Sequence, residues 1–269
     1  MRGLWNLDKS LTMTVLLTLA SLSAIAAADS GTSSLVSTSI DAGGSGRLTA
    51  GDIRTTVRNQ GSVFSGISHV RITIALGTAL VFDKVYDDNA LRVTLVPSTT
   101  ASTPYVVAEL FSGGAHCCTS FLFIDVSGDL PLAREVDFGN YPPERPRPIG
   151  PNREYQYVTI DGTAYDFGAF AGSTGPMHVI AFRNGSILDV SNEHPTMLRD
   201  DERKHLRSYF TNASSGVTDE ADLVSALADA YRLNSQEQVW AQIQQSYLGD
   251  FSAFREKATA WLSQHGYFK

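Results

Sequence analysis

The spacing of apolar residues changes once along this chain, and that change limits the folds open to it. From about residue 35 to residue 190, apolar and polar residues alternate in short runs, as in strands with one buried face. From about Thr196, apolar residues recur with helical spacing. The pattern predicts an α+β protein, with a mostly antiparallel β domain over residues 29–195 and a small C-terminal helical domain over residues 196–269.

The β region carries signals for roughly ten short strands. Alternating runs cover residues 70–74, 81–85 and 91–95, and more continuously apolar runs, typical of central strands, cover residues 105–111 and 121–126. Hairpin turns are predicted at Asp161-Gly162, between residues 155–160 and 163–167, and at Asn184-Gly185, between residues 177–182 and 187–190. These strands predict a blade-like meander or a sandwich.

Two stretches of the β region are predicted to be connections. Residues 141–151 are rich in proline, which cannot donate to a strand ladder, so an extended connector is expected there. Residues 125–129 faintly resemble a calcium-binding turn, but they lack the full ligand set of such a loop. A hairpin turn after a buried strand is the interpretation we favour.

The helical region contains apolar stripes that predict helices packed on the β domain. Thr218 is expected to cap the first stripe, and Ser235 with Gln238 is expected to form a capping box at the start of the second. A further helix is expected over residues 252–264, with Gly266 placed to end it. The stripes have these members: Leu223, Val224, Leu227, Ala230 and Tyr231; Val239, Trp240, Ile243, Tyr247 and Leu248; Phe254, Ala258, Trp261 and Leu262.

The first 28 residues have the pattern of a cleaved signal peptide. Arg2 and Lys9 flank a polar start, a short apolar stretch follows, and three alanines precede Asp29. We therefore expect a periplasmic or secreted protein with no membrane span after cleavage. The chain has a formal net charge of −7 and no Lys/Arg cluster along its sequence, which disfavours nucleic acid and anionic membrane as partners.

The chain has two cysteines, and they are adjacent. A disulfide between neighbours closes no loop of useful length, so a stabilising role is a poor explanation for them. They stand in a turn-forming segment that we predict to be a binding surface: Ser112, Gly113, Gly114, His116, Cys117 and Cys118. The segment is expected to begin at a turn and to continue into the strand that ends near Ile124.

Four interpretations of this cysteine motif are open. Cys117 and Cys118 could form a vicinal disulfide, which is strained and easily reduced because adjacent Cα atoms lie closer than the usual disulfide span. Together with His116 they could bind a soft metal ion, provided that the fold brings another ligand. A His-activated cysteine nucleophile is a third interpretation. A buried pair of small apolar residues is the fourth.

No standard enzyme signature is present: the chain lacks a nucleophile elbow, a phosphate loop, a zincin helix and a C-x-x-C pair. No catalytic residue, metal ligand or cofactor is therefore assigned. We expect an exported, non-enzymatic binding module that recognises a small molecule, a glycan or an envelope protein through the cysteine motif. The alternative is a metal-binding or redox protein that depends on the thiols and His116.

The motif also carries a family resemblance. Residues 111–119 (Phe-Ser-Gly-Gly-Ala-His-Cys-Cys-Thr), together with residues 165–173, 188–191 and 265–268, resemble a family of uncharacterised exported bacterial proteins. Sheets of that family look like blades of FG-GAP, integrin-like propellers, whose acidic loops bind calcium. This chain departs from the family there, because residues 151–154 (Pro-Asn-Arg-Glu) stand where the acidic loop is expected. The resemblance implies no assigned activity. It implies a partial, blade-like β assembly, because a complete propeller needs at least about four blades of four strands and roughly ten strands are predicted here.

Overall fold

The structure is a computed structural model of the chain. It describes residues 35–40, 44–62, 67–99, 101, 103–114, 117–168, 174–214 and 219–268, without the side chains of residues 62, 67, 68, 117, 118 and 165. These residues belong to one compact unit, Leu35–Lys269. The predicted signal peptide lies outside the described residues.

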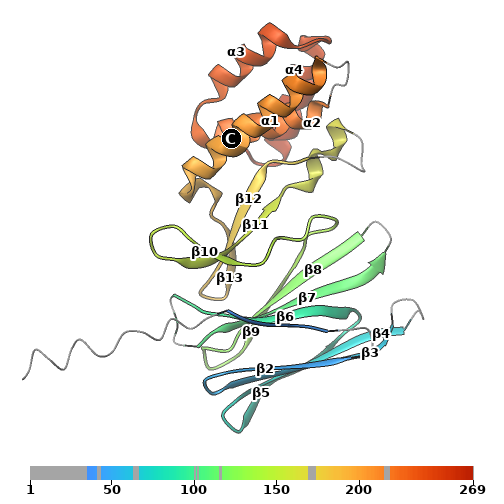
Figure 1. Cartoon of the computed structure of the whole chain (residues 1–269), viewed down its shortest axis with the longest axis vertical. Coiled ribbons are helices and arrows are strands. Elements are labelled where there is room, and N and C mark those ends of the chain that lie inside the picture. Colours follow the sequence, from blue (N-terminus) through green and yellow to red (C-terminus); the bar gives the residue numbers. More distant parts are fainter. Residues whose placement is uncertain are drawn as a thin grey trace, which may run out of the picture. The chain divides into compact units, whose positions relative to one another are not determined.

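Thirteen strands in the described ranges form three antiparallel sheets (Figure 1). The N-terminal sheet contains β2(Ser45–Ala50), β3(Ile53–Ser62), β4(Ile67–Leu76) and β5(Ala79–Tyr86). The central sheet contains, in spatial order, β1(Val36–Ser39), β6(Asn89–Val96), β7(Tyr105–Gly114), β8(Cys117–Asp125) and β9(Leu132–Asp137). The third sheet contains β10(Arg147–Ile149), β11(Glu154–Ile160), β12(Met177–Arg183) and β13(Ser186–Asp189).

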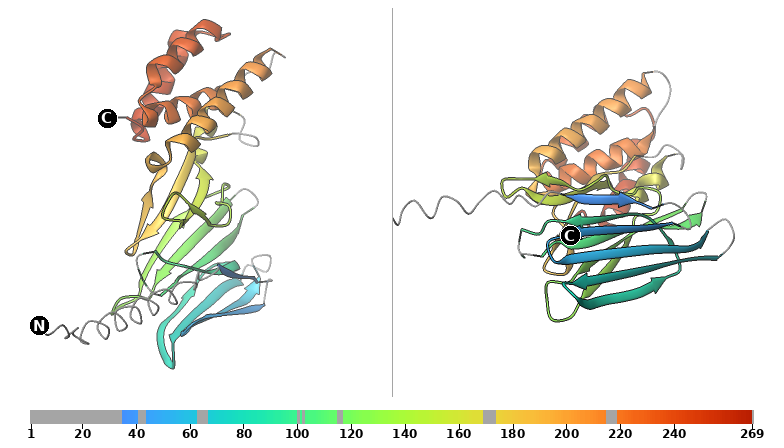
Figure 2. Two further views of the ribbon diagram at one scale, coloured as in Figure 1. Left: turned by 60° about the vertical axis from the view of Figure 1, so that its left-hand side comes forward. Right: turned by 60° about the horizontal axis from the view of Figure 1, so that its bottom comes forward.

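The central sheet is covered on both faces, which explains why β7 and β8 are so continuously apolar. Leu122 and Ile124 point into a core shared with the N-terminal sheet. Phe121 and Phe123 alternate with them and point into an aromatic core shared with the third sheet, where Tyr157 packs edge-on against both rings. In the left view of Figure 2 the central sheet lies between the N-terminal sheet and the third sheet, in agreement with these two cores.

Four helices follow in the part of the chain that the structure describes: α1(Pro195–Ala213), α2(Glu220–Leu233), α3(Gln236–Ser246) and α4(Phe251–Gln264). Leu198 of α1 belongs to one buried apolar cluster with Val179 of the third sheet. Trp240 and Trp261 are buried in the helical core, as predicted, at 5% and 6% exposed. Short 3-10 helices η2(Gly162–Phe167) and η4(Ser191–Glu193) flank β12 and β13 in the sequence. The predicted α+β fold is confirmed.

The two predicted hairpins have different outcomes. The turn at Asn184-Gly185 is confirmed, because it joins β12 to β13 and both residues have positive φ angles of 52° and 72°. The hairpin at Asp161-Gly162 is wrong. Residues 162–167 form η2 instead of a strand, and β11 pairs with β12. The proline-rich connector also contains a short edge strand, β10, where Pro148 lies opposite Tyr155.

The helix ends correct two predicted caps. Thr218 lies outside the described residues, and Asp219 is the N-cap of α2, with its carboxylate accepting from Ala221 N at 3.0 Å. Ser235 is the N-cap of α3, but its hydroxyl donates to Glu202 and forms no capping bond. Gly266 follows α4 with a φ of 75°, as predicted for the residue that ends this helix. Leu248, which was placed in a buried stripe, is 67% exposed.

Candidate functional site

The structure places the cysteine motif at the end of the β7–β8 hairpin. The backbones of Gly114 and Cys117 pair across it, and the strand that begins there runs to Asp125, close to the predicted end. Ser112 is exposed at the end of β7. His116 and the side chains of Cys117 and Cys118 lie outside the described part of the structure. The four interpretations of the motif therefore stay predictions.

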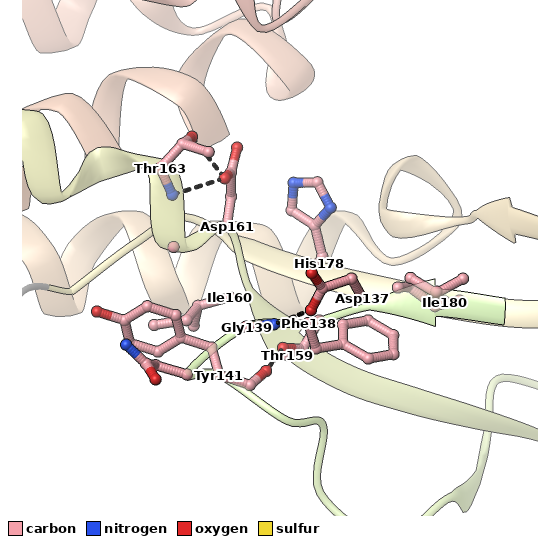
Figure 3. Close-up of a pocket in the computed structure, with 13 residues that line it drawn as sticks. Asp137, Phe138, Gly139, Tyr141, Thr159, Ile160, Asp161, Thr163, His178 and Ile180 are labelled. Atoms are coloured by element: carbon pink, nitrogen blue, oxygen red, sulfur yellow. Dashed lines mark hydrogen bonds between the residues drawn. The ribbon is translucent and has the colours of Figure 1, made fainter. Parts of the chain in front are cut away.

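A pocket of about 510 Å³ lies near the start of β8, between the end of β9 and the third sheet (Figure 3). Thr119, which directly follows the cysteines, exchanges backbone hydrogen bonds with this wall: its N–H donates to Gly139 O, and its carbonyl accepts from Phe138 N, both at 2.9 Å. The pocket is lined by Val136, Asp137, Phe138, Gly139, Asn140, Tyr141, Thr159, Ile160, Asp161, Gly162, Thr163, His178 and Ile180. Its size and its mixture of apolar walls with few polar groups are typical of small-molecule sites.

One wall of the pocket is a tight loop after β9. Asp137 Oδ1 accepts from Gly139 N at 2.7 Å, Gly139 has a φ of 55°, and Tyr141 N donates to Phe138 O at 2.9 Å. These contacts form a turn in which position 139 needs a positive φ, a conformation that glycine adopts easily. The turn presents Phe138 and Tyr141 at the pocket.

Tyr141 is positioned by the strand across from it. The hydroxyl of Thr159 in β11 donates to Tyr141 O at 2.6 Å. The Tyr141 ring lies so close to the backbone of Gly162 that a Cβ there would collide with ring carbons. Gly162 thus permits the Tyr141 ring to pack on the chain just after β11, at one side of the pocket.

An ionised carboxylate marks the polar corner of the pocket. Asp161 Oδ1 accepts from the N–H and the hydroxyl of Thr163, at 3.0 and 2.6 Å, and Oδ2 accepts from the Tyr267 hydroxyl at 2.8 Å. Burial opposes ionisation of Asp161, but these hydrogen bonds hold its pKa below its usual value. The corner is therefore negatively charged at neutral pH.

His178 lies beside this carboxylate and is uncharged. Its Nε2 is 2.9 Å from Arg232 Nη2, and arginine can only donate, so Nε2 accepts and the ring proton is assigned to Nδ1. Nδ1 lies 3.7 Å from Asp189 Oδ2. Burial and the Arg232 charge lower the pKa of His178, in agreement with a neutral ring.

The helical part of the chain contributes to this corner through Arg232 and Tyr267. Arg232 donates to Met177 O at 2.6 Å and to Asp189 Oδ2 at 3.0 Å, and its guanidinium lies 4.8 Å from the centre of the Tyr267 ring. Tyr267 also stacks on Trp261, with ring centres 5.4 Å apart. Residues 188–191 and 265–268 thus supply two side chains, Asp189 and Tyr267, that support the pocket.

His178 and Tyr267 are not placed for proton transfer. Both ring nitrogens of His178 face protein groups, and burial together with the charge of Asp161 raises the pKa of Tyr267 far above its usual value. Neither side chain is poised as a general base near neutral pH. The pocket offers acceptor oxygens from Asp161 and Asp137 beside aromatic and aliphatic walls.

Comparison with known proteins identifies no family model that matches the chain. The chain is 24% identical over 157 residues to a probable thylakoid lumen protein of Synechocystis sp., a match that covers 55% of this chain and 46% of that protein. It therefore spans about half the length of this relative. No solved structure matches.

No helix among the described residues has both the length and the apolar character needed to cross a membrane. No group of three or more His, Cys, Asp or Glu side chains in that part of the chain is arranged to hold a metal ion.

Proposed function

We propose that this chain is an exported binding protein and that its ligand occupies the pocket between β9, β11 and β12. The leader pattern of residues 1–28 and the similarity to a probable thylakoid lumen protein support export. The pocket itself, about 510 Å³ with aromatic walls and one ionised carboxylate corner, is the observation that carries the binding role.

The chemistry of the walls points to a ring that carries hydroxyl groups, such as one sugar residue of a glycan. Asp161 and Asp137 offer acceptors, so the ligand must bring hydrogen-bond donors. Tyr141 and Phe138 offer flat apolar surfaces against which the C–H face of a sugar packs. The cysteine hairpin would extend this surface, because its backbone joins the pocket wall at Gly139.

Saturation-transfer NMR with glucose, galactose and N-acetylglucosamine would test this function. We expect transfer to at least one of these sugars, a loss of transfer in Tyr141→Ala, and binding about tenfold or more weaker in Asp161→Asn, because a charged hydrogen bond is worth about 1.5–3 kcal/mol. Asp129→Asn, at an exposed position outside the pocket, is the matched control and should bind like the parent.

Two results would contradict the proposal. One is the absence of transfer to any of the sugars from folded protein. The other is transfer that persists unchanged in Tyr141→Ala, because the sugar would then bind away from the pocket.

A further inference from the structure

A second hollow, of about 240 Å³, lies on the face of the N-terminal sheet that points away from its core (Figure 2 shows this sheet, β2–β5). It is lined by Arg47, Thr56, Arg58, Arg71 and Thr73, which come from three adjacent strands. The alternate residues of these strands, including Leu48, Val57 and Ile72, fill the core beneath. The polar face is therefore set by strand alternation, and the hollow lies among its side chains.

The N-terminal sheet has a formal charge opposite in sign to that of the whole chain. Residues 45–86 contain five basic residues against two acidic ones, whereas the chain has a net charge of −7. The basic residues are Arg47, Arg54, Arg58, Arg71 and Lys84, and the acidic ones are Asp52 and Asp83. The four arginines alternate onto the outer face, whereas Lys84 lies opposite Ile72, on the side of the core. A locally positive surface on an acidic body concentrates anions at that surface.

The register places two of these arginines directly opposite each other. Arg58 in β3 pairs with Arg71 in β4, and like charges at facing positions destabilise a sheet. Asp83 relieves part of this repulsion, because its carboxylate accepts two hydrogen bonds from Arg71, at 2.8 and 2.6 Å. Neither Arg47 nor Arg58 has an ion-pair partner among the described residues. An anion between them would supply the missing negative charge.

The hydroxyl groups add hydrogen-bonding capacity between the arginines. Thr56 lies between Arg47 and Thr73 in the strand register, and Thr73 donates to Thr56 O at 3.3 Å, which leaves its oxygen able to accept. Guanidinium groups match the geometry of phosphate oxygens. The volume of about 240 Å³ is several times the roughly 30 Å³ that one water occupies in the liquid, so it accommodates a phosphate group and the carbon atoms next to it.

We propose that this hollow is a binding site for a soluble phosphate ester, separate from the pocket at β9, β11 and β12. Arg47 and Arg58 would bind the phosphate dianion from two strands, and Arg71, held by Asp83, would contribute its remaining N–H groups. The ligand charge would relieve the repulsion between Arg58 and Arg71.

Titration of the full chain with inorganic phosphate, at constant ionic strength in a phosphate-free buffer, tests the proposal. We expect saturable binding in calorimetry and a rise in the melting temperature with phosphate. Arg58→Gln should weaken binding at least about tenfold, since it removes charge-assisted hydrogen bonds. Without phosphate its melting temperature should equal or exceed that of the parent, because the cross-strand repulsion is gone.

Arg54→Gln is the matched control. Arg54 is exposed on the same strand as Arg58 but does not line the hollow, so its variant should bind phosphate like the parent. Arg47→Gln, on another strand, should weaken binding as Arg58→Gln does and serves if the latter fails to fold. Equal weakening in Arg54→Gln and Arg58→Gln would overturn the proposal in favour of diffuse attraction. Binding to vesicles of anionic lipid without binding of free phosphate would also overturn it, as would no binding at all.

Discussion

A buried histidine between α1 and α2 gives the fold a pH dependence that can be calculated in advance. His205 is 1% exposed and has a carboxylate at each ring nitrogen: Asp222 Oδ1 lies 2.8 Å from Nδ1, and Asp201 Oδ2 lies 3.2 Å from Nε2. Two carboxylate partners require two ring donors, which only the charged imidazolium has. Also facing this cluster are Lys204 on α1 and Asp229 and Arg232 on α2.

Burial alone would lower the pKa of His205, but hydrogen bonds and attraction to Asp201 and Asp222 raise it from 6.5 to about 9. At about 1.36 kcal/mol for each unit of difference, this raised pKa corresponds to about 3 kcal/mol of unfolding free energy. Because the folded protein holds the proton more tightly than the unfolded chain, this stabilisation is complete below about pH 6.5. It is lost as the pH rises through about 9.

Urea unfolding of the parent and of His205→Gln at pH 5.5, 7 and 9 measures this contribution. The difference in unfolding free energy between the two proteins should shrink by about 3 kcal/mol from pH 5.5 to pH 9. Asp229 is fully buried, and burial raises its pKa well above the usual value. The His205 charge opposes this rise, so the pKa of Asp229 is higher still in His205→Gln.

His69→Gln is the matched control for this experiment. Its pair with Asp87 is exposed, at 46% and 93%, and exposed pairs contribute little to stability. The reasoning is refuted if the His205→Gln difference is as large at pH 9 as at pH 5.5, because the imidazolium would then contribute nothing to the fold.

Three further predictions concern the core, the cysteines and the leader. Trp240→Ala and Trp261→Ala should each cost about 3–5 kcal/mol in chemical unfolding, the usual range for a buried aromatic; unchanged midpoints would contradict their burial. In protein from its native compartment Cys117 and Cys118 should be joined to each other, so its intact mass should be two hydrogens lower than that of the reduced chain; free thiols in unreduced, metal-free protein would refute this. N-terminal sequencing of the exported protein should find a start near Asp29, and retention of the initiating methionine would count against cleavage.

The features that the sequence predicted correctly are those that neighbouring residues determine. Asn184-Gly185 forms the expected turn because both residues tolerate positive φ, and nothing distant is needed. The buried runs at β7 and β8 read as central strands because each position has a covered face. The change of period near Thr196 coincides with the start of α1 at Pro195 for the same local reason.

The predicted turn at Asp161-Gly162 was wrong because a glycine can be required for close packing as well as for a positive φ. Gly162 has no positive φ, so it does not form the predicted type I′ turn. It is needed instead where the Tyr141 ring packs on the backbone, a contact that no local pattern indicates. Asp161 then starts the 3-10 helix η2 through its hydrogen bonds to Thr163.

The pocket corner could not be assembled from the sequence, because its members are far apart along the chain. Tyr267 lies 106 positions from Asp161 and 89 from His178, and Arg232 lies 54 positions from His178. Nothing in the sequence around each residue distinguishes it from an ordinary surface or core residue. Only the packing of the helical part on the third sheet brings them together.

The sequence indicated the polar face that carries the arginine hollow, but it did not show that the arginines lie side by side. Arg54, Thr56 and Arg58 alternate with buried residues along β3, and Arg71 and Thr73 do so along β4, so both strands predict a polar face. A search for consecutive basic residues misses such a cluster, since strand neighbours contribute one arginine each. The pairing register decides whether the arginines meet, and a shift of the register by one residue would move β4 Arg71 to the core face. The buried partners Ile72 and Ile74 exclude that shift, so the apolar core under the sheet is also what places the positive charges together on its outer face.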